Sequence, residues 1–127
     1  MFSKNLEQPI GLEWYTVIGA LVIAPFLETF LWQSLPFSWS TNREKPLLLT
    51  ISLMTIPFAL LHAHRGIAAF LGALIGGVTL SAIYIVWSNA SKSTAFAATA
   101  LTHFLHNAGT LSLMLNSGVT MIPIAQS

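Results

Sequence analysis

The sequence contains no cysteine and no aspartate, and only 7% of its 127 residues are charged. The absence of cysteine excludes disulfides, thiolate metal sites and a cysteine nucleophile. All four acidic residues are glutamates, which excludes catalysis by a pair of membrane-embedded aspartates. No HExxH segment is present either, so a zinc-binding helix of that type is also excluded.

Positive charge is equally scarce in this chain. The Lys and Arg residues number five, the formal net charge is +1, and the basic residues form no cluster. Binding to nucleic acid requires several cations on one surface that neutralise phosphates. We therefore expect no nucleic-acid partner.

Hydrophobic residues, by contrast, make up 54% of the chain and fall into four long runs. A bilayer core about 30 Å thick is crossed by ~20 apolar residues in a helix, and lipid-exposed segments must satisfy their backbone groups internally. The runs therefore predict an all-α, multi-pass integral membrane bundle of about four transmembrane helices, surrounded by lipid and forming one domain over residues 1–127. The expected spans are 14–35, 46–62, 67–87 and 94–115.

Polar segments separate these runs. Residues 36–45 have the composition of a water-exposed loop, and the short segment 64–66 forces the second and third helices into an antiparallel hairpin. Gly72, Gly76 and Gly77 in the third run predict the close approach of another helix. The first run contains an acidic residue and lacks a small-residue cleavage site, so we expect no signal peptide.

That acidic residue, Glu28, lies well inside the first predicted span. A carboxylate at mid-membrane costs about 2.5 to 3.5 kcal/mol on insertion scales, which several apolar neighbours are needed to offset. A structural hydrogen bond between helices would explain its presence. Ionisable residues inside membranes are functional by default, however, and we favour a functional role.

Three more polar side chains occur in the apolar runs. His62 closes the second run, and His103 and Asn107 lie four residues apart on one face of the fourth. Each has a structural alternative, as an interfacial histidine or as a hydrogen-bonded pair between helices. Convergence on one pocket is the more economical explanation, because scattered polar groups would each need a partner in lipid. Together they supply a base for water and donors for an oxyanion.

Two prolines precede these residues. Pro25 lies three residues before Glu28, and Pro57 lies five before His62. Each removes a helical hydrogen bond and is expected to free a carbonyl one turn earlier, on Leu21 and Leu53 respectively.

Four segments in this order, A-P-F-L-E-T-F-L-W-Q, F-A-L-L-H, a glycine-rich helix and H-F-L-H-N, resemble the CAAX-protease and bacteriocin-processing (CPBP, Abi-type) family of intramembrane peptidases. The family's motifs are usually written A-P-x-x-E-E-x-x-x-R, F-x-x-x-H and H-x-x-x-N or H-x-x-x-D. The resemblance implies a protease, and so a hydrolase, acting on a membrane-associated peptide or protein.

The resemblance also implies roles for individual residues. Glu28 would activate a water with the help of His62, while His103 and Asn107 would stabilise the oxyanion or help to hold a metal. Glu28, His62 and His103 are able to ligate zinc, as an intramembrane metalloprotease would require, or to act as acid and base without a metal, and both alternatives stay open. Phe58 would be the packing aromatic of the second motif, with ordinary bulk as an equal alternative.

Two positions depart from the family's first motif. Thr29 stands where a second glutamate is usual, and Gln33 stands where an arginine is usual. The loss of both a glutamate and an arginine leaves no unpaired buried charge, so catalytic activity can survive it. The alternative is a family member that has lost catalysis. His106, three residues after His103, is expected to lie behind the catalytic residues and to support them. The chain is also short for the family, and a homodimer would replace the missing packing.

The expected spans contain one geometric conflict. They place Glu28 and His62 at depths that differ by roughly 10 to 15 Å at 1.5 Å of rise per residue. We therefore expect either later span boundaries, with the second helix running past His62, or a first helix that is broken near Pro25.

Three hypotheses remain from the sequence. The first is an intramembrane endopeptidase that uses Glu28, His62, His103 and Asn107. The second is a catalytically inactive membrane scaffold or immunity protein with the same fold. The third, a proton or ion pathway through Glu28 and the histidines, ranks last because four short helices rarely enclose a continuous path.

Overall fold

The computed structural model describes residues 14–116, and these are helical apart from short turns, without a strand. This confirms the all-α prediction. The segment on which the expectation about a signal peptide partly rests, residues 1–13, lies outside the described residues. The elements, in chain order, are α1 (Trp14–Ile18), the π-helical η1 (Gly19–Ile23), α2 (Ala24–Glu28), the π-helical η2 (Thr29–Ser34), α3 (Leu35–Thr41), α4 (Leu47–His62), the 3-10 turn η3 (Ala63–Arg65), α5 (Ile67–Ser88) and α6 (Lys92–Asn116).

The first five elements form one continuous helix, Trp14–Thr41, in which α-helical and π-helical turns alternate. Both π-helical segments directly precede an α-helical segment with proline in its first turn, Pro25 in α2 and Pro36 in α3. A proline in a helix interior loses one hydrogen bond, and its ring clashes with the preceding turn. A wider π-helical turn before the proline gives the ring room, which lets the helix continue.

The predicted loop over residues 36–45 is therefore wrong in its first half. The helix runs through Pro36 to Thr41, and the actual connection to α4 is residues 42–46. Ser38 and Ser40 read as turn residues in the sequence, but Ser40 is fully buried. Pro36 is inside the continuous helix, and the π-helical segment before it accommodates its ring.

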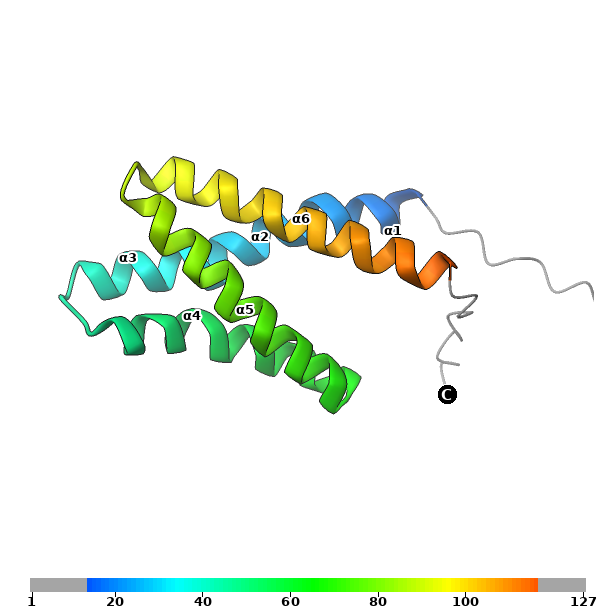
Figure 1. The fold of residues 1–127 in the computed structure, drawn as a ribbon, viewed down its shortest axis with the longest axis horizontal. Helices are drawn as coiled ribbons and strands as arrows, with labels where there is room; N and C mark the ends of the chain where they lie inside the picture. The colour runs from blue at the N-terminus through cyan, green and yellow to red at the C-terminus, as the bar shows by residue number, and fades with distance from the viewer. Residues whose placement is uncertain (1–13, 117–127) are drawn as a thin grey trace, which may run out of the picture.

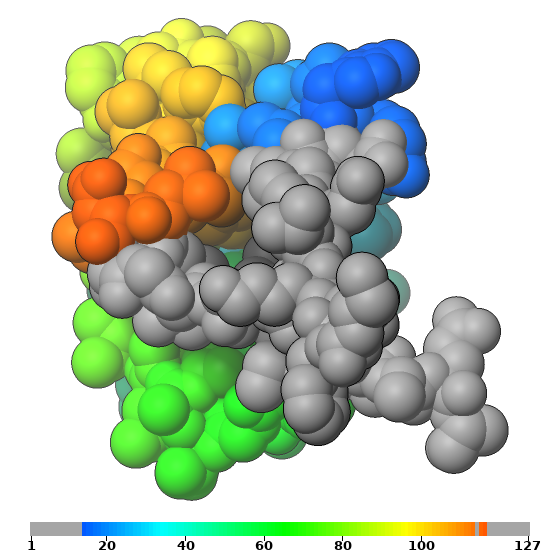
Figure 2. All heavy atoms as spheres, turned by 90° about the vertical axis from the view of Figure 1, so that its right-hand side faces the viewer, coloured from blue at the N-terminus to red at the C-terminus, as the bar shows by residue number. Residues whose placement is uncertain are grey.

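The remaining helices fold back and forth on this long helix (Figure 1). The α4–α5 connection is the expected tight hairpin, in which Gly66 adopts φ 103°, a conformation that L side chains rarely adopt. The polypeptide then returns from α5 to α6, which contacts η1, α2 and η2. Viewed from the end where α1 begins, α1 and α6 lie in the upper part and the α4–α5 hairpin below (Figure 2).

Three described helices are long and apolar enough to cross a membrane, namely Trp14–Thr41, Leu47–Arg65 and Ile67–Ser88. These support a membrane bundle as predicted. The fourth expected span is the 25-residue helix α6, which is long enough but does not reach the same apolarity. Its polar residues, which include His103 and Asn107, are the physical reason.

The helices meet through both small and aromatic residues. Met54, Tyr84 and Ala95 form the buried hydrophobic cluster of the described residues, and Phe37 packs against it. A Cβ atom added at Gly77 would lie 3.1 Å from the Thr55 side chain, so α4 and α5 approach closely there. Cβ atoms added at the other two glycines of that run, Gly72 and Gly76, would meet nothing within 4 Å.

Candidate active site

The candidate site is built around a direct contact between Glu28, at the end of α2, and His103 on α6. The His103 Nε2 atom lies 3.3 Å from Glu28 Oε2. The His103 side chain is 5% exposed and the Glu28 side chain 29%, so the pair is shielded but reachable from one side. Because a carboxylate only accepts hydrogen bonds, the Nε2 atom carries the hydrogen when Glu28 is ionised.

The depths of the site residues agree in the structure. The end of α3 and the beginnings of α4 and α6 lie at the same end of the bundle (Figure 1). Measured from that end at 1.5 Å of rise per residue, Glu28 lies about 20 Å deep, His62 about 22 Å and His103 about 16 Å. The extension of the first helix through Pro36 removes the mismatch that the predicted spans contained.

Phe58 connects the two histidines of the site. Its ring centroid is 4.7 Å from that of His62, one turn later on α4, and 5.7 Å from that of His103, edge to face. The Phe58 side chain is buried. The structure therefore brings His62 and His103 to one aromatic ring, and Glu28, on a third helix, contacts His103.

The hydrogen bond of His62 defines which ring nitrogen is available for chemistry. His62 Nδ1 lies 2.9 Å from the Phe58 carbonyl oxygen. A carbonyl oxygen only accepts, so Nδ1 is the donor and the Nε2 atom of the neutral ring keeps a free lone pair. His62 is thus prepared to accept a proton and not, in its neutral form, to donate one to an oxyanion.

Asn107 is engaged differently from the expectation. Its Nδ2 donates to the Ala20 carbonyl oxygen at 3.0 Å, in the π-helical segment η1. In that segment the N–H of Ala24 bonds to Gly19, five residues back. The same pattern would join residue 25 to Ala20, but Pro25 has no N–H. Asn107 therefore supplies the hydrogen bond that Pro25 cannot make.

The proline effect thus falls on a different carbonyl from the expected one. The sequence prediction placed the unpartnered carbonyl on Leu21, which assumes α-helical bonding to the residue four back. The π-helical turn shifts the partner by one residue, to Ala20. Sequence reasoning had no signal for the π-helical geometry.

The two motif departures, Thr29 and Gln33, are fully buried and lie one turn apart in η2. The Thr29 hydroxyl and both polar atoms of the Gln33 amide have no hydrogen-bond partner among the described residues. Thr99, one turn before His103 on α6, was not singled out from the sequence, and its buried hydroxyl is also unpartnered. Its position four residues before His103, on the same face of the helix, was the sequence feature that could have identified Thr99.

Other polar residues lie at the edge of the site. His106 is exposed. His64 is exposed, with its Nδ1 atom 2.6 Å from the Leu61 carbonyl oxygen. Neither ring reaches the Glu28 carboxylate through a hydrogen bond or ion pair found in residues 14–116.

The arrangement does not fit a metal ion as the side chains stand. Within residues 14–116, no three His or Glu side chains are placed so that they can hold one ion. His103 Nε2 faces Glu28, and His62 Nδ1 is bonded to its own helix. The ligand set Glu28, His62 and His103 stays a prediction, and we derive no step through zinc.

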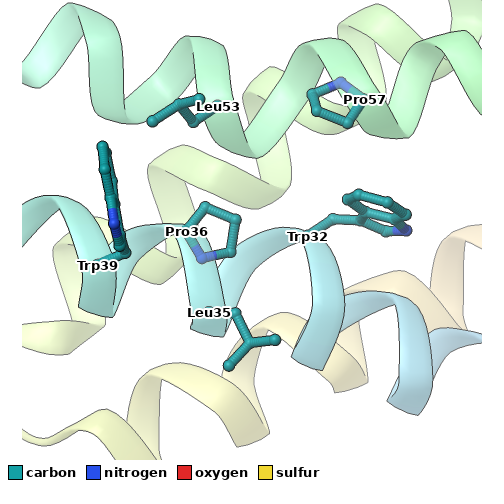
Figure 3. A pocket seen from close by; sticks show the side chains of 6 residues that line it. All are labelled: Trp32, Leu35, Pro36, Trp39, Leu53 and Pro57. Carbon is teal, nitrogen blue, oxygen red and sulfur yellow. The ribbon is translucent and has the colours of Figure 1, made fainter.

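A groove lies on the neighbouring surface, between the first helix and α4 (Figure 3). The groove is open to the outside and has a volume of about 360 Å³. Six side chains line it: Trp32, Leu35, Pro36, Trp39, Leu53 and Pro57. None of the predicted site residues is among them.

Fold and site together define a helical membrane protein with a glutamate–histidine pair in its interior. A family model, described as type II CAAX prenyl endopeptidase Rce1-like, matches residues 10–109. The chain belongs to this family, which confirms the resemblance to CPBP peptidases. No curated protein and no solved structure matches the chain.

Proposed function

We propose that this protein is an intramembrane endopeptidase that hydrolyses a peptide bond of a membrane-associated peptide or protein. The observation that supports this most strongly is the Glu28–His103 contact at 3.3 Å between two helices that are far apart in sequence. The family is a protease family, and Glu28 matches the glutamate of its first motif.

In the proposed reaction, Glu28 accepts a proton from a water molecule while the water oxygen forms a bond to the peptide carbonyl carbon. The free Nε2 lone pair of His62 assists by accepting a hydrogen bond from the same water. The His103 Nε2–H is the donor placed beside Glu28, and it stabilises the developing oxyanion. The C–N bond then breaks, and Glu28 passes its proton to the leaving amine.

Asn107 has an indirect role in this proposal. Its amide holds the Ala20 carbonyl and so fixes the turn that leads to Pro25 and Glu28. A direct oxyanion contact, which the family resemblance implies, would require the amide to leave Ala20 when substrate binds.

The family description, type II CAAX prenyl endopeptidase, suggests a substrate class. We propose a peptide with a prenylated cysteine near its carboxyl end as the first probe. A bilayer would present such a substrate beside the helices, because its prenyl chain partitions into lipid.

The test is cleavage of a farnesylated fluorogenic peptide by purified protein in vesicles. Glu28→Gln should lower kcat by at least about 100-fold, the usual size of a general-base contribution. Glu44→Gln is the matched control, because Glu44 is exposed in the turn before α4, and it should stay within about twofold of wild type. Cleavage by Glu28→Gln at the wild-type rate would overturn the mechanism.

A catalytically inactive scaffold or immunity protein is the second candidate. Two observations favour it: Thr29 and Gln33 replace the usual ionisable residues, and the Asn107 amide is occupied by Ala20. This candidate predicts no cleavage by wild type, and function in cells that is unchanged by Glu28→Gln.

Light scattering of the purified protein tests the predicted homodimer.

A further inference from the structure

Seven buried side-chain polar atoms in residues 14–116 have no hydrogen-bond partner, and two of these are Trp32 Nε1 and Ser40 Oγ. The other five lie on two helical segments that contact each other. They belong to Thr29 and Gln33 in η2, and to Thr99 and His103 in α6. All four side chains are more than nine-tenths buried. Burying a polar group without a hydrogen bond costs free energy, so each such group in a native protein needs an explanation.

These four residues come from two packed helical segments. Helix α6 contacts η2, and the Glu28–His103 pair joins the two helices, which run in opposite directions (Figure 1). From that pair toward the Thr41 end, the next buried polar residues are Thr29 and Gln33 on the first helix and Thr99 on α6. The residues that carry these atoms therefore lie on adjacent turns of two contacting helical segments.

The two threonines differ from several other threonines in the described helices. The hydroxyls of Thr50, Thr79 and Thr102 each donate to the carbonyl four residues back, which satisfies them within their own helix. Thr29 and Thr99 make no such bond. A helical threonine has this local partner available, so hydroxyls that do not use it are oriented toward something else.

The hydrogen-bonding capacities of the group also point to one ligand. With Nε2–H facing ionised Glu28, the Nδ1 atom of neutral His103 is an acceptor. The Gln33 amide has N–H donors and a carbonyl acceptor, and each threonine hydroxyl can donate and accept a hydrogen bond. Water is the ligand that both donates and accepts and is small enough for a buried polar site, where it usually makes about three hydrogen bonds.

We infer that the interior between η2 and α6 is a water-binding site, formed by Thr29, Gln33, Thr99 and His103 Nδ1, and that its bound water positions the His103 ring against Glu28. Thr99 and Gln33 are then positioning residues that act through this water. The catalytic part of the inference rests on the proposed function, whereas the water site itself does not.

The first test separates positioning from packing. Thr99→Val removes the hydroxyl at nearly constant volume, Thr99→Ser keeps it, and Gln33→Met removes the amide. On the farnesylated peptide, Thr99→Val and Gln33→Met should lower kcat about tenfold with KM within about twofold, because the ring is misplaced and not the substrate. Thr99→Ser should restore kcat. Thr102→Val is the control on the same helix and should match wild type.

The second test needs no activity. In ¹⁵N-histidine-labelled protein, with His103 signals assigned through His103→Gln, the Nδ1 resonance should shift in Thr99→Val and stay unchanged in Thr102→Val. A cross-relaxation signal from long-lived water to the His103 ring is expected in wild type and lost in Thr99→Val.

The outcomes distinguish the two proposals. If the wild type is inactive but the His103 Nδ1 resonance shifts in Thr99→Val, the peptidase proposal is refuted and the water site is retained. Identical Nδ1 resonances in wild type and Thr99→Val overturn the water site, whatever the activity. Equal kcat in Thr99→Val and Thr102→Val overturns the positioning role.

Discussion

The Asn107–Ala20 hydrogen bond provides a sharp test of how the site is held together. Asn107→Ala leaves the Ala20 carbonyl without a partner, because Pro25 cannot donate to it. Hydrogen bonds between membrane helices are worth about 0.6 kcal/mol on average and up to about 1.7. This carbonyl has no replacement in its own helix, so we expect a loss near the upper end, about 1 to 1.5 kcal/mol.

A second substitution isolates the cause of that loss. Pro25→Ala restores an N–H that can donate to Ala20 or Leu21, so Asn107→Ala should cost less in this background. We expect a coupling energy of about 0.5 to 1 kcal/mol in the double-mutant cycle. Pro25 is buried, so Pro25→Ala leaves a space where the ring was. Both proteins that carry Pro25→Ala share this space, so its free-energy cost cancels in the coupling energy.

The assay is reversible unfolding in mixed micelles, followed by circular dichroism for all four proteins of the cycle. A coupling energy near zero would refute the link between Pro25 and Asn107. Asn107→Ala should also lower peptidase activity in the wild-type background, with partial recovery in the double variant. Full loss of activity in both backgrounds would instead show that the amide acts directly on the substrate.

Two further predictions concern packing. Gly77→Leu should destabilise the protein by about 1 to 3 kcal/mol in the same unfolding assay, because its Cβ would already lie 3.1 Å from the Thr55 side chain and 3.2 Å from Phe58. Gly76→Leu, where the added Cβ meets nothing within 4 Å, should change stability by less than about 0.5 kcal/mol. Tyr84→Phe should cost about 1 kcal/mol, because the buried hydroxyl of Tyr84 donates to Ser34 at 3.0 Å, and near-wild-type stability would contradict this.

Much of the fold was predictable because lipid leaves few choices. Long apolar runs must be helices, and the short segment before Gly66 required a hairpin. The meeting of Glu28 with His103 was also predictable, because few buried polar groups were available to pair. The family followed from the spacing of these same residues.

The local geometry of the first helix was not predictable by the same means. Pro36, Ser38 and Ser40 have the composition of a turn, and pattern alone could not show that a π-helical segment lets the helix pass through Pro36. The error also produced the apparent depth conflict between Glu28 and His62. Similarly, the partner of Asn107 depends on a shift from four-residue to five-residue bonding, which no residue type signals.

The polarity of α6 connects the fold to the proposed chemistry. Thr99, His103 and Asn107 recur every four residues along one face of this helix. His103 contacts the Glu28 carboxylate and Asn107 the Ala20 carbonyl, while the Thr99 hydroxyl has no partner among the described residues. The first helix presents the matching polar groups. They are the Glu28 carboxylate and the Ala20 carbonyl, which lies in a π-helical segment. Helices α4 and α5 carry the strong apolarity instead. Because His103 and Asn107 meet polar groups across the interface, the cost of placing them beside lipid is offset only when the bundle is assembled, and the site and the fold form together.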